Sequence, residues 1–349
     1  MSSKTDSSIA IVGSGILGLT AARLLQRTFP NRSLTLIAAE FPSQDPSTLS
    51  VDYTSAWAGA HYRPIPAGDN PQLLLEAELG KKTYEIRKKE FAEHGEKIGI
   101  RFMEGVEYLA KPSQAVLALQ SGDGSYAGEG DGFRVFENQE LPEGVMWGCR
   151  YWTYDVNPDI YCPRLLKDFV DAGGKLVTTK LDNLEEAFKA VEGAATVVNC
   201  SGKGFGDDKV LVTRGQTVLV RNECKRTITR QNGDGTWTAL IPRPGAGTII
   251  GVSKEVGDME AGARIETRLA LLEKAKRLLP GQVLKNEGDE WDVIRDIVGR
   301  RPTREGGLRL EVEKLGQEKR IVHAYGAGGR GYELSWGIAE EVIRMVKSE

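Results

Sequence analysis

The feature that most restricts the fold of this chain is a glycine-rich turn between an apolar segment and a helical one. Residues 8–12 are typical of a buried strand, and Gly13-Ser14-Gly15-Ile16-Leu17-Gly18 follows at once and opens a predicted helix over residues 19–25. A second apolar strand is predicted at residues 33–38, and Glu40 lies just beyond it. This order of strand, Gly-x-Gly-x-x-Gly turn, helix, strand and acid predicts a dinucleotide-binding unit.

The three glycines of the turn have separate physical roles. Gly13 permits a tight turn, Gly15 lets backbone amides approach a pyrophosphate, and Gly18 lets the helix pack closely on the strand. Glu40 is placed to accept hydrogen bonds from ribose hydroxyls. The alternative is a chance glycine-rich turn, since glycine is common, but the surrounding strand, helix and acid favour nucleotide binding.

Size and charge exclude several classes of protein. A chain of 349 residues is long enough for two modest domains or one large α/β domain. Its formal net charge of -3 argues against a general nucleic-acid binder, which normally carries a basic excess. Apolar runs stay short of the roughly 18 residues that span a bilayer, and the polar residues 1–8 do not resemble a secretory signal. We expect neither a nucleic acid nor a membrane as partner.

The cysteines are dispersed, at positions 149, 162, 200 and 224, without a Cys-x-x-Cys pair. The three histidines are equally scattered, so neither a metal site nor a disulfide framework is predicted. This usage favours a reducing, intracellular compartment, either cytoplasmic or peroxisomal. Residues 347–349 do not form the peroxisomal Ser-Lys-Leu address.

The rest of the chain alternates between helical and extended patterns. Helices are predicted at residues 71–95, 163–171, 183–191, 265–279 and 337–347, strands at 176–178, 196–199, 216–221 and 240–250, and a β-rich meander over 101–153. The order predicts an α/β fold: a discontinuous Rossmann-type domain with an inserted α+β domain on a mostly antiparallel sheet. We expect the first to comprise residues 1–62, 155–214 and 290–349, and the second, for substrate binding and interfaces, residues 63–154 and 215–289.

Four ordered motifs together resemble those of the FAD-dependent D-amino acid oxidase and D-aspartate oxidase family. They are residues 13–18 with the downstream acid, Thr54-Ser55-Ala56-Trp57-Ala58-Gly59-Ala60, Val298-Gly299-Arg300-Arg301-Pro302-Thr303-Arg304, and the glycine-rich stretch from His323 to Gly337. The resemblance extends over about residues 8–345. It implies that the Rossmann-type domain binds FAD.

The resemblance also implies which residues form the FAD site. They are Gly13, Gly15, Ile16, Leu17, Gly18, Glu40, Thr54, Ser55, Ala58, Gly59, Leu181, Ser201, Gly299, Gly328, Gly329, Gly331, Tyr332 and Glu333. The glycines near the C-terminus make a close-approach surface suited to a flat ring. A glycine-rich turn without a ligand is the alternative there. Glu333 stands where the family has Thr or Gln, so it either turns away from the flavin or pairs with Arg330.

Arg301 is the predicted anchor for substrate. A guanidinium offers a planar fork that matches a carboxylate, and Pro302 keeps the preceding backbone extended. By resemblance Arg301 binds the α-carboxylate; the alternative is a surface or interdomain ion pair. Lys254 and Arg330 are further cations assigned to the site by the same resemblance.

Two departures from the family bear on substrate. Ala239 replaces a tyrosine of members with neutral substrates, and Lys254 stands where they have an aromatic residue and where the D-aspartate oxidase branch has an arginine. These changes predict a cationic pocket for an acidic D-amino acid such as D-Asp or D-Glu. Alternatively, Lys254 points to solvent, and the space at Ala239 admits a larger or N-substituted substrate.

The implied reaction passes a hydride from the substrate Cα to flavin N5, so the protein needs no acid or base at the reacting carbon. The imino acid then hydrolyses to a 2-oxo acid and ammonia, and O2 yields hydrogen peroxide. The small-molecule partners are therefore an amino acid and O2, in a monomer or homodimer. An oxidase of an N-substituted glycine or other amine on the same scaffold is one alternative. A non-catalytic flavoprotein or NAD-binding sensor is another.

Overall fold

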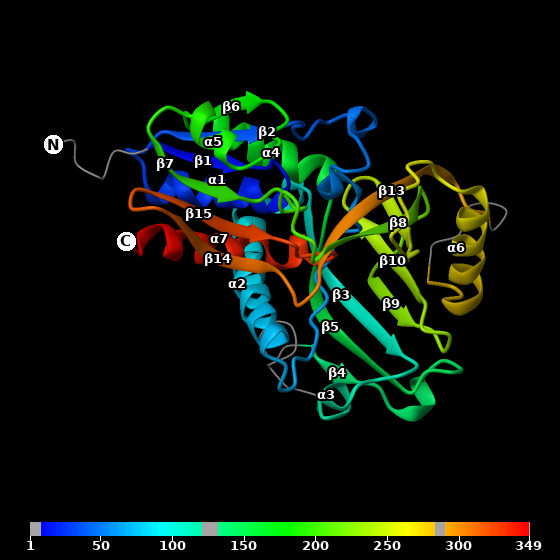
Figure 1. Ribbon diagram of the computed structural model, residues 1–349. Helices are drawn as coiled ribbons and strands as arrows, with labels where there is room; N and C mark the ends of the chain where they lie inside the picture. The colour runs from blue at the N-terminus through cyan, green and yellow to red at the C-terminus, as the bar shows by residue number, and fades with distance from the viewer. Residues whose placement is uncertain (1–7, 121–131, 283–289, 349) are drawn as a thin grey trace. The chain divides into compact units, whose positions relative to one another are not determined.

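The computed structural model describes residues 8–120, 132–282 and 290–348. The polar segment of residues 1–7 therefore lies outside the described residues. A six-stranded sheet runs in the order β14-β15-β7-β1-β2-β6 (Figure 1). Its strands are β1 (Ser8–Val12), β2 (Leu34–Ala38), β6 (Lys175–Thr178), β7 (Ala194–Asn199), β14 (Arg309–Leu315) and β15 (Lys319–Tyr325). Neighbouring strands are parallel except for the antiparallel β14–β15 pair, which is the arrangement of a Rossmann-type domain.

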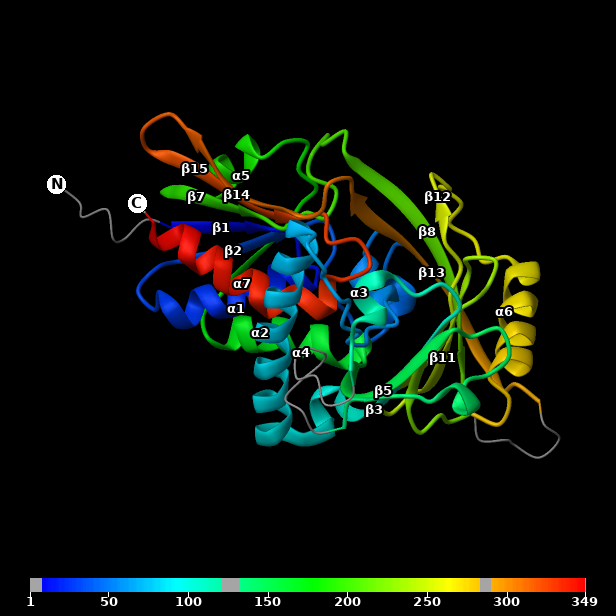
Figure 2. The ribbon, with the colours of Figure 1, turned by 90° about the horizontal axis from the view of Figure 1, so that it is seen from below.

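Helices flank this sheet because its strands are apolar on both faces. Ala10 and Val12 of β1 pack with Ala187 in one buried cluster, while Ile9 and Ile11 alternate to the other side. The helices are α1 (Ile16–Thr28), α4 (Pro158–Asp171), α5 (Glu185–Ala190) and α7 (Gly331–Lys347), and α1 and α7 lie side by side (Figure 2). Both α4 and α7 begin earlier than predicted. The glycines before residue 337 had indicated a loop, but Gly331 already lies in the first turn of α7.

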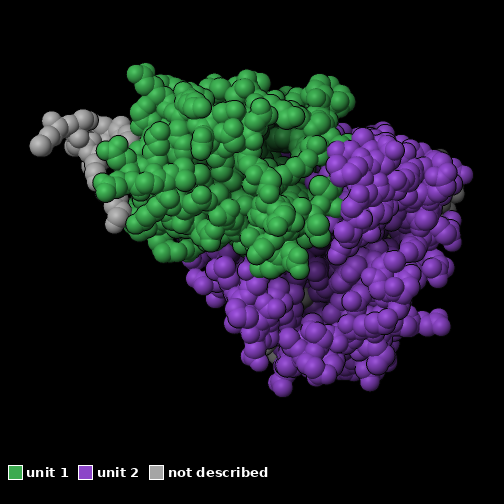
Figure 3. Space-filling model, viewed as in Figure 1, with its two compact units in different colours: residues 1–56, 159–212, 301–349 green, residues 57–158, 213–300 purple. Residues whose placement is uncertain are grey.

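The chain divides into two compact units (Figure 3). Unit 1 comprises residues 1–56, 159–212 and 301–349, and unit 2 comprises residues 57–158 and 213–300. The predicted boundaries at residues 62, 155, 214 and 290 fall near these divisions, with the last one differing most.

Unit 2 contains most of a nine-stranded, largely antiparallel sheet in the order β12-β8-β11-β10-β9-β3-β5-β4, with β13 paired to β8. The strands are β3 (Ile100–Leu109), β4 (Arg134–Val135), β5 (Trp147–Val156), β8 (Val210–Val220), β9 (Thr227–Gln231), β10 (Trp237–Arg243), β11 (Gly247–Gly251), β12 (Glu255–Val256) and β13 (Val293–Arg304). The helices are α2 (Pro71–His94), α3 (Gln114–Leu117) and α6 (Ile265–Leu278). Short 3₁₀ turns are η2 (Pro46–Thr48), η3 (Thr54–Trp57), η4 (Gly95–Ile98) and η5 (Asn138–Glu140).

The prediction of a single strand at residues 240–250 is wrong. The segment forms a hairpin in which Leu240 pairs with Ile250 across β10 and β11. The turn uses Gly245 and Gly247, whose φ angles of 74° and 95° suit glycine. The reason is that Pro244 and the glycines interrupt an otherwise continuous apolar pattern.

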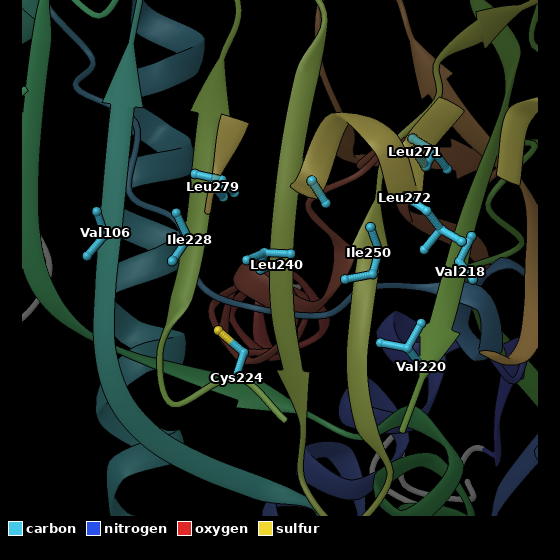
Figure 4. Close-up of a cluster of buried hydrophobic side chains, with 11 residues drawn as sticks. Val106, Val218, Val220, Cys224, Ile228, Leu240, Ile250, Leu271, Leu272 and Leu279 are labelled. Carbon is cyan, nitrogen blue, oxygen red and sulfur yellow. The ribbon is translucent and has the colours of Figure 1, made fainter. Parts of the chain in front are cut away.

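The core of unit 2 lies between the large sheet and α6 (Figure 4). Val106, Ile228 and Leu240 come from successive strands and meet Leu271 and Leu272 of the helix. Successive side chains of a strand point to opposite faces of the sheet, and the apolar side chains on one face pack against α6.

We expect Leu240→Ala to lower the free energy of unfolding by about 2–5 kcal/mol, because it removes a fully buried side chain and leaves a cavity. Urea unfolding of the purified protein measures this loss. Leu269→Ala is the control, since Leu269 of α6 is 59% exposed. Equal losses in both variants would mean that the α6–sheet core does not hold unit 2 together.

Among the described residues, no helix has the length and apolar character needed to cross a membrane.

Candidate active site

The turn between β1 and α1 forms the first part of the site. Gly15 is the N-cap of α1 and has no side chain to cap it, and the Ile16 amide donates to Ser55 Oγ at 2.9 Å. The first-turn amides and the helix dipole favour an anion at this end. The turn is therefore suited to a pyrophosphate.

The glycines of this turn are in close contact with backbone. A Cβ atom on Gly13, whose φ is 103°, would lie 2.4 Å from the Cys200 carbonyl oxygen. A Cβ on Gly18 would lie 1.8 Å from the Gly13 carbonyl oxygen. Any side chain at either position would push the turn open.

Glu40 follows β2, at the carboxyl end of the parallel strands. Its carboxylate accepts hydrogen bonds from the Ser50 amide at 2.8 Å and the Ser50 hydroxyl at 2.5 Å. Ligands of doubly wound sheets bind beyond this edge. Glu40 thus lies where a ribose-binding acid is expected, whereas Leu181 packs on the apolar cluster that contains Val12 and Ile37.

The glycine loop before α7 is in contact with the Arg301 segment. The Gly328 amide donates to the Pro302 carbonyl oxygen at 3.1 Å, and a Cβ on Gly329 would lie 3.8 Å from Arg301 Cδ. A Cβ on Gly331 would lie 3.3 Å from Ile16 Cγ2, so the loop also reaches the start of α1. The structure therefore brings together three of the motifs that the sequence had singled out.

Two further predicted residues hold this arrangement in place. The Tyr332 hydroxyl donates to the Ser55 carbonyl oxygen at 2.8 Å. On the preceding loop, the Ser201 amide donates to Asn199 Oδ1 at 3.1 Å, and the Ser201 hydroxyl accepts from the Gly204 amide at 3.1 Å. Thr54 and Ser55 lie in η3.

Arg330 and Glu333 form an ion pair at the start of α7, with Nε and Oε2 2.8 Å apart. Their side chains are 15% and 11% exposed. Of the two orientations left open for Glu333, the structure shows the pair with Arg330. Glu333 thus neutralises the charge of Arg330, so Arg330 is less suited to bind an acidic substrate side chain.

The remaining predicted residues belong to unit 2. The Ala58 carbonyl oxygen accepts from buried Arg243 at 2.9 Å, and a Cβ on Gly59 would lie 2.9 Å from Ile241 Cδ1. A Cβ on Gly299 would lie 2.8 Å from Trp57 Cβ. Lys254 is exposed in the loop between β11 and β12.

Ala239 lies in an aliphatic cluster of the large sheet, with Trp57 packed against it. Its partners are Leu219, Ile241, Ile249 and Ile297. The position is 6% exposed, so its methyl group is buried and brings no hydroxyl of the kind that a tyrosine would.

Asp155 is a buried acid that sequence reasoning missed. Asp155 of β5 is fully buried, and neither carboxyl oxygen has a hydrogen-bond partner among the described residues. Burial raises the pKa of Asp155 well above its ordinary value, although Arg101 opposes this. His61 forms a β-bridge with Asp155, and burial followed by the charge of Arg63 lowers the pKa of His61 to about 3. Both groups are therefore neutral over a wide pH range. The signal was an acid in a strand whose other residues, apart from Arg150 and Thr153, are apolar or aromatic.

We expect Asp155→Asn to stabilise the protein increasingly as the pH rises. The unfolded carboxyl loses its proton near pH 4, whereas the folded one keeps it to higher pH, so the parent loses stability from about pH 4 up to the folded pKa. Urea unfolding between pH 4.5 and 8 compares the variant with the parent. The control is Asp292→Asn, which removes an exposed partner of Arg221. A pH-independent difference for Asp155→Asn would show that this carboxyl is ionised in the folded protein.

Known proteins match this chain over nearly its whole length. The model of the DAO family, described as FAD dependent oxidoreductase, matches residues 8–345. A D-aspartate oxidase of Talaromyces thermophilus is 52% identical and the match covers 97% of this chain and 94% of that protein. A D-amino-acid oxidase of Schizosaccharomyces pombe is 31% identical, with 97% and 95% covered. A glycine oxidase of Bacillus cereus shares the fold, with a TM-score of 0.69 at 15% identity and 99% and 96% of the two chains covered.

A Rossmann-type sheet with a glycine-rich turn before α1 and a second glycine loop at α7 is typical of nucleotide-binding proteins. With the family match over nearly its whole length, the chain belongs to the DAO family of FAD-dependent oxidoreductases. FAD is its cofactor, and the predicted α/β fold and family are confirmed.

Proposed function

We propose that this enzyme oxidatively deaminates D-amino acids, with D-Asp and D-Glu preferred. The balanced reaction consumes the amino acid, O2 and water and releases a 2-oxo acid, ammonia and hydrogen peroxide. The observation that carries the proposal is the position of Arg301 beside the glycine loop at Gly329. The 52% identity to a D-aspartate oxidase supports the acidic substrate class.

The residues of unit 1 fit FAD. The turn leads into the N-terminus of α1, which suits the pyrophosphate, and Glu40 has carboxylate acceptor capacity for ribose hydroxyls. The loop around Gly328 and Gly329 has no side chains at these two positions, so its backbone would allow close approach of a flat ring. FAD supplies the two-electron oxidation of the substrate and passes the electrons to O2.

The protein's own part is to bind and orient the amino acid. Arg301 binds the α-carboxylate through its fork, which fixes the direction of the Cα–H bond. His61 is neutral and has no charge to offer the substrate. No protein group has to abstract a proton from Cα in this reaction.

Anaerobic reduction of the FAD-loaded protein tests the proposal. D-Asp is expected to bleach the flavin absorbance faster than D-Ala, and L-Asp is expected to leave it unchanged. Bleaching by L-Asp as fast as by D-Asp would contradict the stereochemistry of the proposal. Bleaching by sarcosine alone would instead establish oxidation of an N-substituted glycine.

Lys254 is the proposed receptor for the acidic side chain. We expect Lys254→Met to lower kcat/KM for D-Asp and D-Glu about 10-fold relative to D-Ala, because a point charge facing a carboxylate is lost. Steady-state kinetics with the three substrates measure the ratio. Lys225→Met, at another exposed lysine, is the control. Equal losses on all three substrates would leave Lys254 as a solvent-facing residue, as its exposure allows.

A further inference from the structure

Three segments of unit 1 meet at the carboxylate of Asp207. One oxygen accepts hydrogen bonds from Arg304 Nε at 2.7 Å and from the Tyr325 hydroxyl at 2.8 Å. The other accepts from the Lys209 amide at 3.0 Å. The Asp207 side chain is 9% exposed, and its bonds to Arg304 and Tyr325 are partly buried, whereas the bond from the Lys209 amide is exposed. Asp207 thereby links the loop after β7 to the ends of β13 and β15.

Backbone contacts reinforce the same junction. The Glu305 amide donates to the Lys209 carbonyl oxygen at 2.8 Å, and Thr303 forms a β-bridge with Ala327. A Cβ on Gly204 would lie 2.3 Å from the Tyr325 ring. The segment that follows Arg301 is thus held on one side by the loop after β7 and on the other by the glycine loop.

Asp207 is a permanent charge. Its hydrogen bond with Arg304, together with that of Tyr325 and the Lys209 amide, lowers the pKa of Asp207 to about 2 although burial opposes this. Arg304 also donates through Nη1 to the Gly307 carbonyl oxygen at 3.2 Å. Arg304 therefore serves the junction, while Arg301, three residues earlier, is the arginine beside Gly329.

We propose that Asp207 is a positioning residue for substrate binding: through Arg304 and Tyr325 it fixes the strand end that presents Arg301. The inference rests on the proposed role of Arg301 as carboxylate anchor. A guanidinium fork binds a carboxylate well only in a narrow range of orientations, and small misplacements of a binding group cost much of its effect. Without Asp207 the strand end samples more positions, and the fork loses affinity.

The test uses the FAD-loaded protein and succinate, which is aspartate without its amino group and is not oxidised. We expect Asp207→Asn to weaken succinate binding about 10-fold, measured by the change in flavin absorbance and by thermal shift. The KM for D-Asp is expected to rise by the same factor while kcat changes less than about 3-fold. In an Arg301→Ala background, Asp207→Asn is expected to have less than a 2-fold further effect, because the two residues act through one contact.

A matched control lies on the same strand. Asp296 of β13 pairs with Arg268, with Nε and Oδ1 3.0 Å apart, and its side chain is 12% exposed. Asp296→Asn removes a comparable ion pair and is expected to leave succinate binding unchanged. A loss equal to that of Asp207→Asn would overturn the proposal, because general loosening of β13 would then explain both.

The other outcomes separate this inference from the proposed function. If Arg301→Ala abolishes succinate binding but Asp207→Asn does not weaken it, only the positioning role is wrong. If the double variant binds succinate more weakly than Arg301→Ala by the full factor that Asp207→Asn causes alone, the two residues act independently and the positioning role is also overturned. If Arg301→Ala leaves succinate binding unchanged, the carboxylate anchor is wrong and the positioning role is refuted with it. Should Asp207→Asn fail to fold, Tyr325→Phe removes one of the two side-chain donors and is expected to weaken succinate binding about 3-fold.

Discussion

Arg301→Ala is expected to lower kcat/KM for D-Asp on the order of 10²-fold or more, with FAD still bound. The guanidinium is the proposed anchor for the α-carboxylate, and charge-assisted, bidentate hydrogen bonds are among the strongest that a protein offers a ligand. A 10²-fold loss corresponds to about 2.7 kcal/mol of transition-state stabilisation. Steady-state oxygen uptake with D-Asp, together with the flavin spectrum of each preparation, measures the effect.

The adjacent Arg300 provides the control. Arg300 donates to the Met259 carbonyl oxygen within unit 2 and has no proposed substrate contact. Arg300→Ala is therefore expected to change kcat/KM less than about 3-fold. Comparable losses in both variants, or an unchanged value in Arg301→Ala, would contradict the assignment of Arg301 as the anchor.

Gly18→Ala is expected to lower the affinity for FAD roughly 10- to 100-fold. The new methyl group would overlap the Gly13 carbonyl oxygen, which is backbone and cannot rotate aside as a side chain can. Relief requires α1 to move away from the turn, and overpacking of this kind costs about 1–3 kcal/mol. The amides of the first turn of α1 then no longer point at the pyrophosphate. If this cost appears in binding, each 1.4 kcal/mol lowers the affinity for FAD about tenfold. Fluorescence titration of the FAD-free protein with FAD measures the change.

A glycine outside the turn provides the control. Gly233 lies between β9 and β10, and a Cβ there would have no atom within 4 Å. Gly233→Ala is expected to leave the affinity for FAD unchanged. If Gly18→Ala also binds FAD normally, the turn does not need the close approach that its glycines provide.

Local patterns were enough to predict the parts of the fold that have local causes. The turn at Gly13 to Gly18, the strands on either side of it and the helix predicted over residues 71–95 follow from glycine spacing and apolar runs. In the structure this helix covers residues 71–94, where Asn70 caps it by accepting from the Leu73 amide at 3.1 Å and Gly95 ends it with a φ of 66°. The hairpin within residues 240–250 was missed because two buried strands read as one apolar run when the turn between them is short.

Side-chain contacts between residues far apart in the chain could not be predicted from local sequence patterns. Asp207, Arg304 and Tyr325 are polar residues of ordinary type, far apart in the chain, and only the folded sheet places them together. The pairing of Arg330 with Glu333 was one of the two orientations left open for Glu333. The structure shows it because α7 begins at Gly331, and residues three apart face each other on a helix. The burial of Asp155 depends on what covers β5, which strand periodicity does not reveal.

The most direct test of the account is hydrogen peroxide release in air, with added FAD, from paired D- and L-amino acids and N-methylated forms. We expect more peroxide from D-Asp and D-Glu than from the neutral D-amino acids, and none from the L-forms. Peroxide mainly from neutral D-amino acids would keep the reaction and remove Lys254 as a selectivity residue. Absence of peroxide across the D-amino acids from a yellow, FAD-loaded protein would contradict the central claim.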